Sequence, residues 1–208
     1  MAGQIVLVPI YLMYWNVETY GVWLAIQAIV NLFSMLDFGH QQFIGFEFLR
    51  IGKNNRKTIS EYLWSGALTG VFICLVQIGL VIILVFSGAL PFILGEADTK
   101  DKALLDAAGI VLILQMVTWL IGTSVAGLMT RLFSAIEYFP RMAWWGTTNT
   151  AVMLIAPLLA VIFGAGLLVT GVVTAVAAIA YCIPLYIDLL GLLRKERIAF
   201  TRPSLQLG

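Results

Sequence analysis

The stretch from Met142 to Ile187 carries no charged side chain, and this run constrains the fold more than any other feature of the sequence. A helix crosses the roughly 30 Å of hydrocarbon in a bilayer with about 20 apolar residues, so the stretch is long enough for two crossings. Gly164, Ala165, Gly166 and Gly171 lie near its middle and offer a place to turn. The stretch therefore predicts two membrane-spanning helices joined by a tight hairpin.

Composition places the whole chain in a bilayer. Hydrophobic residues make up 61% of its 208 residues and charged residues 11%, with a mean hydropathy of +0.98, far from the balance of water-soluble domains. The apolar runs are long and unbroken, whereas a transmembrane β-barrel alternates over segments of about 10 residues. We therefore predict an all-α, polytopic helical membrane protein.

Three further stretches are apolar enough for crossings, at residues 19–46, 62–95 and 107–130. A fourth, residues 4–15, rises only about 18 Å, which is too short for the bilayer, and we interpret it as the back half of a truncated helix. The sequence thus predicts about six transmembrane helices with an incomplete first one. They form a transmembrane lobe over residues 1–193, followed by a basic cytoplasmic tail over residues 194–208.

Basic side chains segregate to alternate loops, as the positive-inside rule expects of a membrane protein. The loops of one side hold Lys100 and Lys102, next to the acidic residues Glu96, Asp98 and Asp101. The loops and tail of the other side hold Arg50, Lys53, Arg56, Lys57, Arg131, Arg141, Arg194, Lys195, Arg197 and Arg202. We therefore expect both termini to be cytoplasmic and the acidic loop to face outward.

The sequence carries no signature of an enzyme or of a cofactor protein. It has no Walker A loop, no glycine-rich dinucleotide fingerprint and no His/Cys cluster with metal-ligand spacing, and a single histidine anchors little chemistry. The net charge of +1 gives no reason to expect a nucleic-acid partner. We predict a membrane transporter, not an enzyme, with no cofactor or metal.

The second span carries a polar stripe formed by Gln27, Asn31, Ser34, Asp37 and Gln41. Their spacings of three and four residues put all five side chains on one face of a helix. Two interpretations of the amides stay open, because polar side chains in a bilayer both line water-filled cavities and hydrogen-bond neighbouring helices. For Asp37 a functional role is the better interpretation, since an ionisable group at that depth is costly.

His40 follows Asp37 by three residues, close enough to pair with it on the helix. A carboxylate and an imidazole together can hold or relay a proton. An interfacial histidine at the helix end is the competing interpretation, and the one that we favour. Near the end of the last span, Asp188 precedes Arg194 and Lys195, and we expect it to form a local ion pair with them.

Several short segments resemble a known family. They are Pro9-Ile-Tyr-Leu, Tyr20-Gly-Val-Trp23, Leu36-Asp-Phe-Gly39, Tyr62-Leu-Trp-Ser and the loop from Arg131 to Arg141. In this order, with a basic loop before the fourth segment, they are similar to the N-terminal region of the bacterial O-antigen and exopolysaccharide flippases. These flippases belong to the multidrug/oligosaccharidyl-lipid/polysaccharide exporter superfamily.

The resemblance implies a transporter that moves an undecaprenyl-diphosphate-linked oligosaccharide from the inner to the outer leaflet of the bacterial inner membrane for polysaccharide biosynthesis. In this family two six-helix lobes surround a central cavity and open it alternately to the two sides of the membrane. A proton or sodium gradient drives this alternating access. The chain would then supply one lobe and be a fragment or half of a longer protein. Its partners would be membrane lipid and either a second six-helix lobe or a second copy of itself.

Each group of polar residues has a candidate role in such a transporter. Amides and hydroxyls can replace water around a sugar chain, which assigns the substrate path to Gln27, Asn31, Ser34 and Gln41. The ion-coupling candidates are Asp37 and His40. A diphosphate headgroup calls for cations, although the positive-inside rule already explains the three candidates at the cytoplasmic mouth, Arg50, Arg131 and Arg141.

Two other classes stand as alternatives. A drug/cation antiporter of the same superfamily would present more acidic residues in the outer half of the lobe and an aromatic-lined pocket. The outer half of the second span offers Gln27 and Asn31 instead of acidic residues, which favours a sugar substrate. A non-transporting membrane scaffold would use every polar residue to hold helices together, and Asp37→Ala would then be neutral.

Overall fold

The computed structural model describes residues 2–94 and 101–203, and within them every regular element is helical, as predicted. The outer-loop residues Glu96, Asp98 and Lys100 lie outside this range. The helices are α1 (Ala2–Tyr14), α2 (Val17–Ile51), α3 (Arg56–Phe86), α4 (Leu90–Ile93), α5 (Lys102–Trp119), η1 (Leu120–Ser124), α6 (Val125–Ala135), α7 (Phe139–Ile162) and α8 (Leu167–Lys195).

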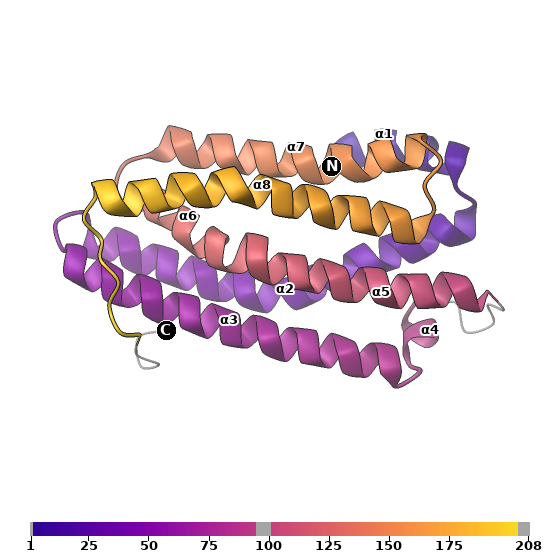
Figure 1. Ribbon diagram of the computed structural model, residues 1–208, viewed down its shortest axis with the longest axis horizontal. Helices are drawn as coiled ribbons and strands as arrows, with labels where there is room; N and C mark the ends of the chain where they lie inside the picture. The colour runs from indigo at the N-terminus through magenta and orange to yellow at the C-terminus, as the bar shows by residue number, and fades with distance from the viewer. Residues whose placement is uncertain (1, 95–100, 204–208) are drawn as a thin grey trace.

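Five spans in the described residues are long and apolar enough to cross a membrane, and they run side by side along the long axis of the molecule (Figure 1). They are α2, α3, the continuous third span formed by α5, η1 and α6, and then α7 and α8. The first helix, α1, has 13 residues and rises about 20 Å, which is shorter than a bilayer crossing. The fold is that of a multi-pass helical membrane protein.

Local sequence explains where several spans begin. The first backbone N–H groups of a helix have no partner within it, and a polar side chain just before the helix accepts from them. Asn16 accepts from the Thr19 N–H at 2.7 Å at the start of α2, and Asn55 accepts from the Thr58 N–H at 3.2 Å at the start of α3. Asp101 caps α5 in the same way.

The predicted hairpin turn lies between α7 and α8. Gly164 has a φ of 80°, a left-handed conformation that costs glycine little because it has no Cβ. Gly171, which we expected to contribute to the turn, lies instead inside α8, buried against Val111 of α5. Its small size therefore serves the packing of two helices and not the reversal of the chain.

The basic loops meet at one end of the bundle, which we call the basic end. A salt bridge of 2.9 Å from Lys53 to Glu137 joins the α2–α3 loop to the α6–α7 loop there. At the opposite end, the Trp15 indole N–H donates to the carbonyl of Ala165 in the α7–α8 turn at 2.7 Å. The fold thus keeps the basic loops apart from the α7–α8 turn, as the positive-inside rule requires of a membrane protein.

After α8 the chain crosses the basic end and lies against α3 (Figure 1). Glu196 forms a salt bridge of 2.5 Å with Arg56. The Trp64 indole donates to the carbonyl of Ala199 at 3.2 Å, and its ring packs against Phe200 with 5.0 Å between centroids. The described part of the predicted tail is therefore held on the bundle.

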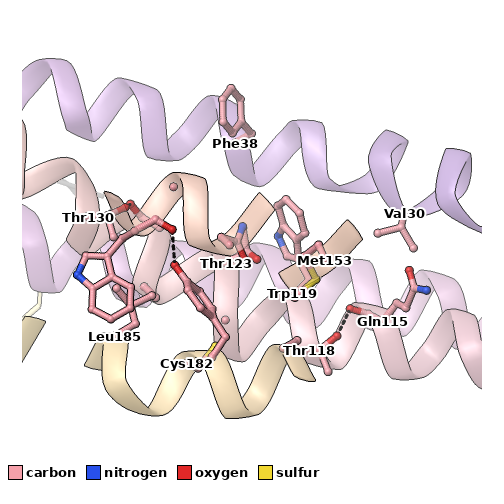
Figure 2. A pocket seen from close by; sticks show the side chains of 18 of the residues that line it. Val30, Phe38, Gln115, Thr118, Trp119, Thr123, Thr130, Met153, Cys182 and Leu185 are labelled. Carbon is pink, nitrogen blue, oxygen red and sulfur yellow. Dashed lines mark hydrogen bonds between the residues drawn. The ribbon is translucent and has the colours of Figure 1, made fainter. Parts of the chain in front are cut away.

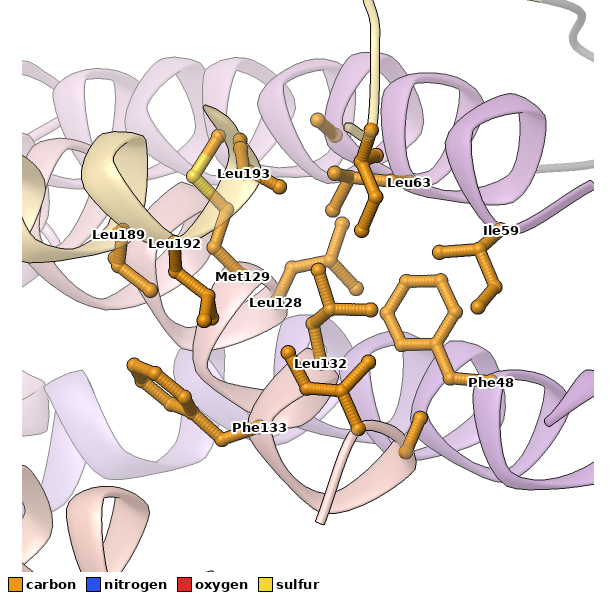
Figure 3. Close-up of a cluster of buried hydrophobic side chains, with 14 of the residues drawn as sticks. Phe48, Ile59, Leu63, Leu128, Met129, Leu132, Phe133, Leu189, Leu192 and Leu193 are labelled. Carbon is orange, nitrogen blue, oxygen red and sulfur yellow. The ribbon is translucent and has the colours of Figure 1, made fainter. Parts of the chain in front are cut away.

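Buried apolar side chains form two clusters, one toward each end of the bundle. The cluster at the basic end joins α2, α3, α6 and α8, and Figure 3 shows among others Phe48, Leu63, Leu128, Phe133 and Leu189. The cluster at the opposite end includes Trp23, Ile26, Val111, Leu112 and Val161. On α2 and on the third span, the buried polar residues Asp37, Gln41 and Ser124 lie between the two clusters.

Candidate functional site

A cavity of about 670 Å³ lies within the bundle, between α2, the third span, α7 and α8 (Figure 2). Its aromatic lining comes from Trp23, Phe38, Trp119, Trp145 and Tyr181. Its polar lining comes from Gln27, Asn31, Gln41, Gln115, Thr118, Thr123, Thr130, Asn149 and Thr174. In the described part of the chain, Arg131 is the one charged side chain among the lining residues.

The predicted polar stripe of α2 divides between this cavity and the interior of the bundle. The cavity is lined by Gln27, Asn31 and Gln41, whereas Ser34 and Asp37 are not among its lining residues. Ser34 donates to the backbone carbonyl of Asn31 at 2.8 Å. Gln27 also donates to the Gln115 side chain at 3.1 Å, so the same amide lines the cavity and bonds to a neighbouring helix.

Asp37 is fully buried and accepts hydrogen bonds from three side chains. One carboxylate oxygen accepts from the Gln41 amide at 2.7 Å and from the Trp119 indole at 2.9 Å, and the other accepts from the Ser124 hydroxyl at 2.9 Å. We call these four residues the Asp37 cluster. An ionised carboxylate only accepts hydrogen bonds, so three converging donors suit its charged form.

Trp119 and Ser124 were not predicted from the sequence. They lie 82 and 87 residues from Asp37 along the chain and meet it only because α2 packs against the third span. The available signal was a serine inside an apolar span, which requires a partner in a bilayer. Trp119 also lines the cavity, so its ring contacts the cavity while its N–H bonds to the buried carboxylate.

The structure does not join His40 to Asp37 by a hydrogen bond. The His40 Nε2 lies 2.8 Å from the carbonyl of Gly66, which identifies this nitrogen as a donor. Both residues approach Gly70 of α3, where an added Cβ would lie 3.5 Å from Asp37 Oδ1 and 3.7 Å from His40 Cδ2. The two ion-coupling candidates are thus neighbours without being paired.

The three headgroup candidates lie in different surroundings. Arg131 lines the cavity with its guanidinium 5.3 Å from the centroid of the Phe38 ring, and within the described residues it forms no salt bridge. Arg50 is exposed and binds Glu47 on its own helix at 2.5 Å. Among the three, only Arg131 presents an uncompensated charge to the cavity.

Arg141 pairs with Asp188 across α7 and α8, through its Nε at 2.7 Å and through a second bond from Nη2. The Trp145 indole donates to the same carboxylate at 2.7 Å. Our expectation that Asp188 pairs with Arg194 and Lys195 is therefore wrong. The cause is the orientation of α8, which turns Asp188 toward α7 at the edge of the cavity.

In the described residues no group of three or more His, Cys, Asp or Glu side chains is placed to hold a metal ion. Cys74 and Cys182 are free and buried. Neither a known protein-family model, nor a curated protein, nor a solved structure matches this chain. The cavity and the Asp37 cluster are therefore the features from which a function has to be argued.

Proposed function

We propose that this chain is the N-terminal lobe of a transporter that flips an undecaprenyl-diphosphate-linked oligosaccharide across the bacterial inner membrane by ion-coupled alternating access. The observation that carries the proposal is the cavity inside a membrane-spanning bundle, which combines amides, hydroxyls and aromatic rings with a single unpaired arginine. The resemblance of the N-terminal segments to polysaccharide flippases points to the same substrate.

The polar wall suits the glycan part of such a substrate. Each sugar hydroxyl that enters hydrocarbon without a partner costs several kcal/mol, so a path through the bilayer must supply hydrogen bonds. Gln27, Asn31 and Gln41 of α2 line one side of the cavity, and Asn149 of α7 lines another. The indole ring of Trp119 and the phenol ring of Tyr181 add apolar faces against which sugar rings can pack.

Arg131 suits the diphosphate. Its guanidinium is partly buried, lines the cavity and lacks an acidic partner in the described residues, which leaves its charge available to an anion. Arg141 is not a lining residue, although Met142 and Trp145 of the same helix are. Its charge is neutralised by Asp188. We therefore reduce the three headgroup candidates to Arg131.

The remaining parts of the proposal follow from the resemblance and from the charge pattern. Both termini lie in the cytoplasm, a second six-helix lobe or a second copy of the chain completes the transporter, and the lipid tail stays in the bilayer. The coupling ion is a proton or sodium, with Asp37 as its site and His40 as a neighbour. Ser34 leaves the substrate path, since it lies outside the cavity lining.

The alternatives fit the cavity less well. The aromatic lining of the cavity would also suit a drug/cation antiporter, but such an antiporter needs acidic groups that face its substrate, and the described lining residues contain an arginine and no carboxylate. A scaffold protein has no use for a cavity of about 670 Å³ with an unpaired charge in its wall.

Complementation tests the proposal. A bacterium that lacks its own O-antigen flippase would receive this chain alone or fused to a candidate C-terminal lobe, with surface polysaccharide as the readout. We expect rescue by the fusion, and rescue by the chain alone would mean that two copies suffice. Failure of both, with the protein present in the membrane, would contradict the proposal and favour the scaffold.

Arg131→Gln is expected to weaken binding of undecaprenyl-diphosphate-linked oligosaccharide to the chain in nanodiscs by roughly 10- to 100-fold, because a charge-assisted hydrogen bond contributes about 1.5–3 kcal/mol. Arg50→Gln is the matched control, since Arg50 is exposed and paired with Glu47 outside the cavity. Equal affinities of the two variants would remove Arg131 from the headgroup site.

A further inference from the structure

The third span is interrupted at the level of the cavity by one turn of π-helix, Leu120–Ser124. A π turn accommodates an extra residue in an α-helix and occurs frequently at functional sites. Neighbouring helices hold this turn through its backbone carbonyls. The Tyr186 hydroxyl of α8 donates to the carbonyl of Ile121 at 2.5 Å, and the Gln41 amide of α2 donates to the carbonyl of Thr123 at 3.1 Å.

Asp37 binds both borders of the same turn. Trp119 is the residue immediately before the π-helix and Ser124 is its last residue, and both donate to the Asp37 carboxylate at 2.9 Å. Gln41 adds a third bond to the carboxylate while it also binds Thr123. The buried Asp37 carboxylate therefore connects the two ends of the π turn.

We propose that the Asp37 carboxylate holds Leu120–Ser124 as a π-helix and that uptake of a proton by Asp37 releases this turn to an ordinary α-helix. Protonation removes the negative charge of Asp37, so the hydrogen bonds that its Oδ2 accepts from Gln41 and Trp119 become neutral ones, about half as strong as charge-assisted bonds. The bond with Ser124 on Oδ1 must then reverse its direction or break. The weaker bonds no longer offset the free-energy cost of the π turn relative to an ordinary α-helical turn.

Conversion of the turn would change the cavity wall. When the turn changes from π-helix to α-helix, it no longer accommodates one extra residue. The helix on one side of the turn then rotates relative to the other side by about 100°, the rotation of one residue at 3.6 residues per turn. The α5 side carries Gln115 and Trp119, and the α6 side carries Gly127 and Arg131, and all four line the cavity. The rotation therefore alters which groups of α5 and α6 face the substrate together.

The other titratable groups near Asp37 come from three helices. His40 of α2 approaches it across Gly70, and the Cys74 thiol of α3 lies near Ser124. Arg131 of α6 lies instead over the Phe38 ring on the cavity side. Within the described residues no cation pairs with Asp37, so hydrogen bonds from three neutral donors stabilise the charge of its carboxylate.

A native cysteine provides a reporter for the turn. A Cβ placed on Gly122, in the middle of the π-helix, would lie 2.8 Å from the sulfur of Cys182 in α8. This approach suits a disulfide, in which the Cβ of one cysteine lies about 3 Å from the sulfur of the other. We therefore expect Gly122→Cys in the full chain in nanodiscs to cross-link efficiently to Cys182 under mild oxidation, and Gly122→Cys with Cys182→Ser to show no such product.

The test compares cross-linking yields at one fixed pH, because thiolate reactivity itself depends on pH. Adding Asp37→Asn, which mimics the protonated acid, is expected to lower the yield roughly twofold, as a tenfold change in an equilibrium that starts at about 10:1 in favour of the π turn would. Ser124→Ala, which removes one border contact without touching the charge, is expected to lower it in the same direction. Ser34→Ala is the control, since among the described residues the Ser34 hydroxyl bonds only to the carbonyl of Asn31 in its own helix.

An unchanged yield in Asp37→Asn would overturn the proposal, and so would an unchanged yield in Ser124→Ala or the absence of cross-linking in Gly122→Cys itself. If Asp37→Asn does not yield a folded protein, an unchanged yield in Ser124→Ala still overturns the proposal. The inference rests on the proposed function only for the use of the proton. A positive cross-linking result with failed complementation would retain the switch and reject the transporter, and the reverse result would reject the switch alone.

Discussion

Replacing Gly171 by alanine is expected to lower the apparent melting temperature of the chain in nanodiscs by roughly 5–10 °C, whereas Gly191→Ala in the same helix is expected to leave it unchanged or raise it slightly. A Cβ on Gly171 would lie 2.7 Å from Cγ1 and 3.1 Å from Cβ of Val111, closer than side chains tolerate. Overpacking of this kind costs roughly 1–3 kcal/mol. Apart from its chain neighbours and the backbone of its own helix, no atom of the described residues lies within 4 Å of a Cβ on Gly191.

The cost should be specific to one contact between α5 and α8. Val111→Ala removes the two γ-carbons, the closest atoms that a Cβ on residue 171 would meet, so Gly171→Ala combined with Val111→Ala is expected to recover most of the lost melting temperature. Heating in nanodiscs followed by size-exclusion chromatography measures the folded fraction. If Gly171→Ala and Gly191→Ala melt alike, the two helices do not approach each other at Gly171.

The sequence predicted the helical class and the spans because hydropathy is a strong signal in a bilayer. Long uncharged runs have few structural solutions there, since every backbone group must find its partner within a helix. The hairpin between α7 and α8 followed from the same run, and the glycine at residue 164 supplied the turn. Gly171 was misinterpreted because a glycine at a helix contact and a glycine in a turn look the same in a sequence.

Partners that are distant along the chain could not be predicted in this way. Asp188 was assigned to the bases that follow it, yet it binds Arg141, 47 residues earlier, because the packing of α7 on α8 decides which cation it faces. The π turn likewise leaves no mark in hydropathy, since one extra residue does not alter the apolar character of a span. The polar stripe of α2 was visible, but its division between cavity and interior depends on where the third span lies.

Among single substitutions in the Asp37 cluster, Asp37→Leu is expected to produce the largest loss of stability. It removes the acceptor of three buried donors on Gln41, Trp119 and Ser124. Each buried donor left without a partner costs about 1–3 kcal/mol, and breaking a buried charged network typically costs 3–5 kcal/mol. We therefore expect the apparent melting temperature in nanodiscs to fall by at least about 10 °C.

Two comparisons separate this effect from a general intolerance of α2 to change. Ser34→Ala alters another buried polar residue of the same helix, whose hydroxyl bonds within the described range only to the carbonyl of Asn31. This variant is expected to melt within about 2 °C of the parent chain. Asp37→Asn keeps one acceptor oxygen and should melt between the parent and Asp37→Leu. If Asp37→Leu melts at the same temperature as the parent, the donors on Gln41, Trp119 and Ser124 find other partners. Asp37 would then not be needed to hold the third span in place beside the cavity.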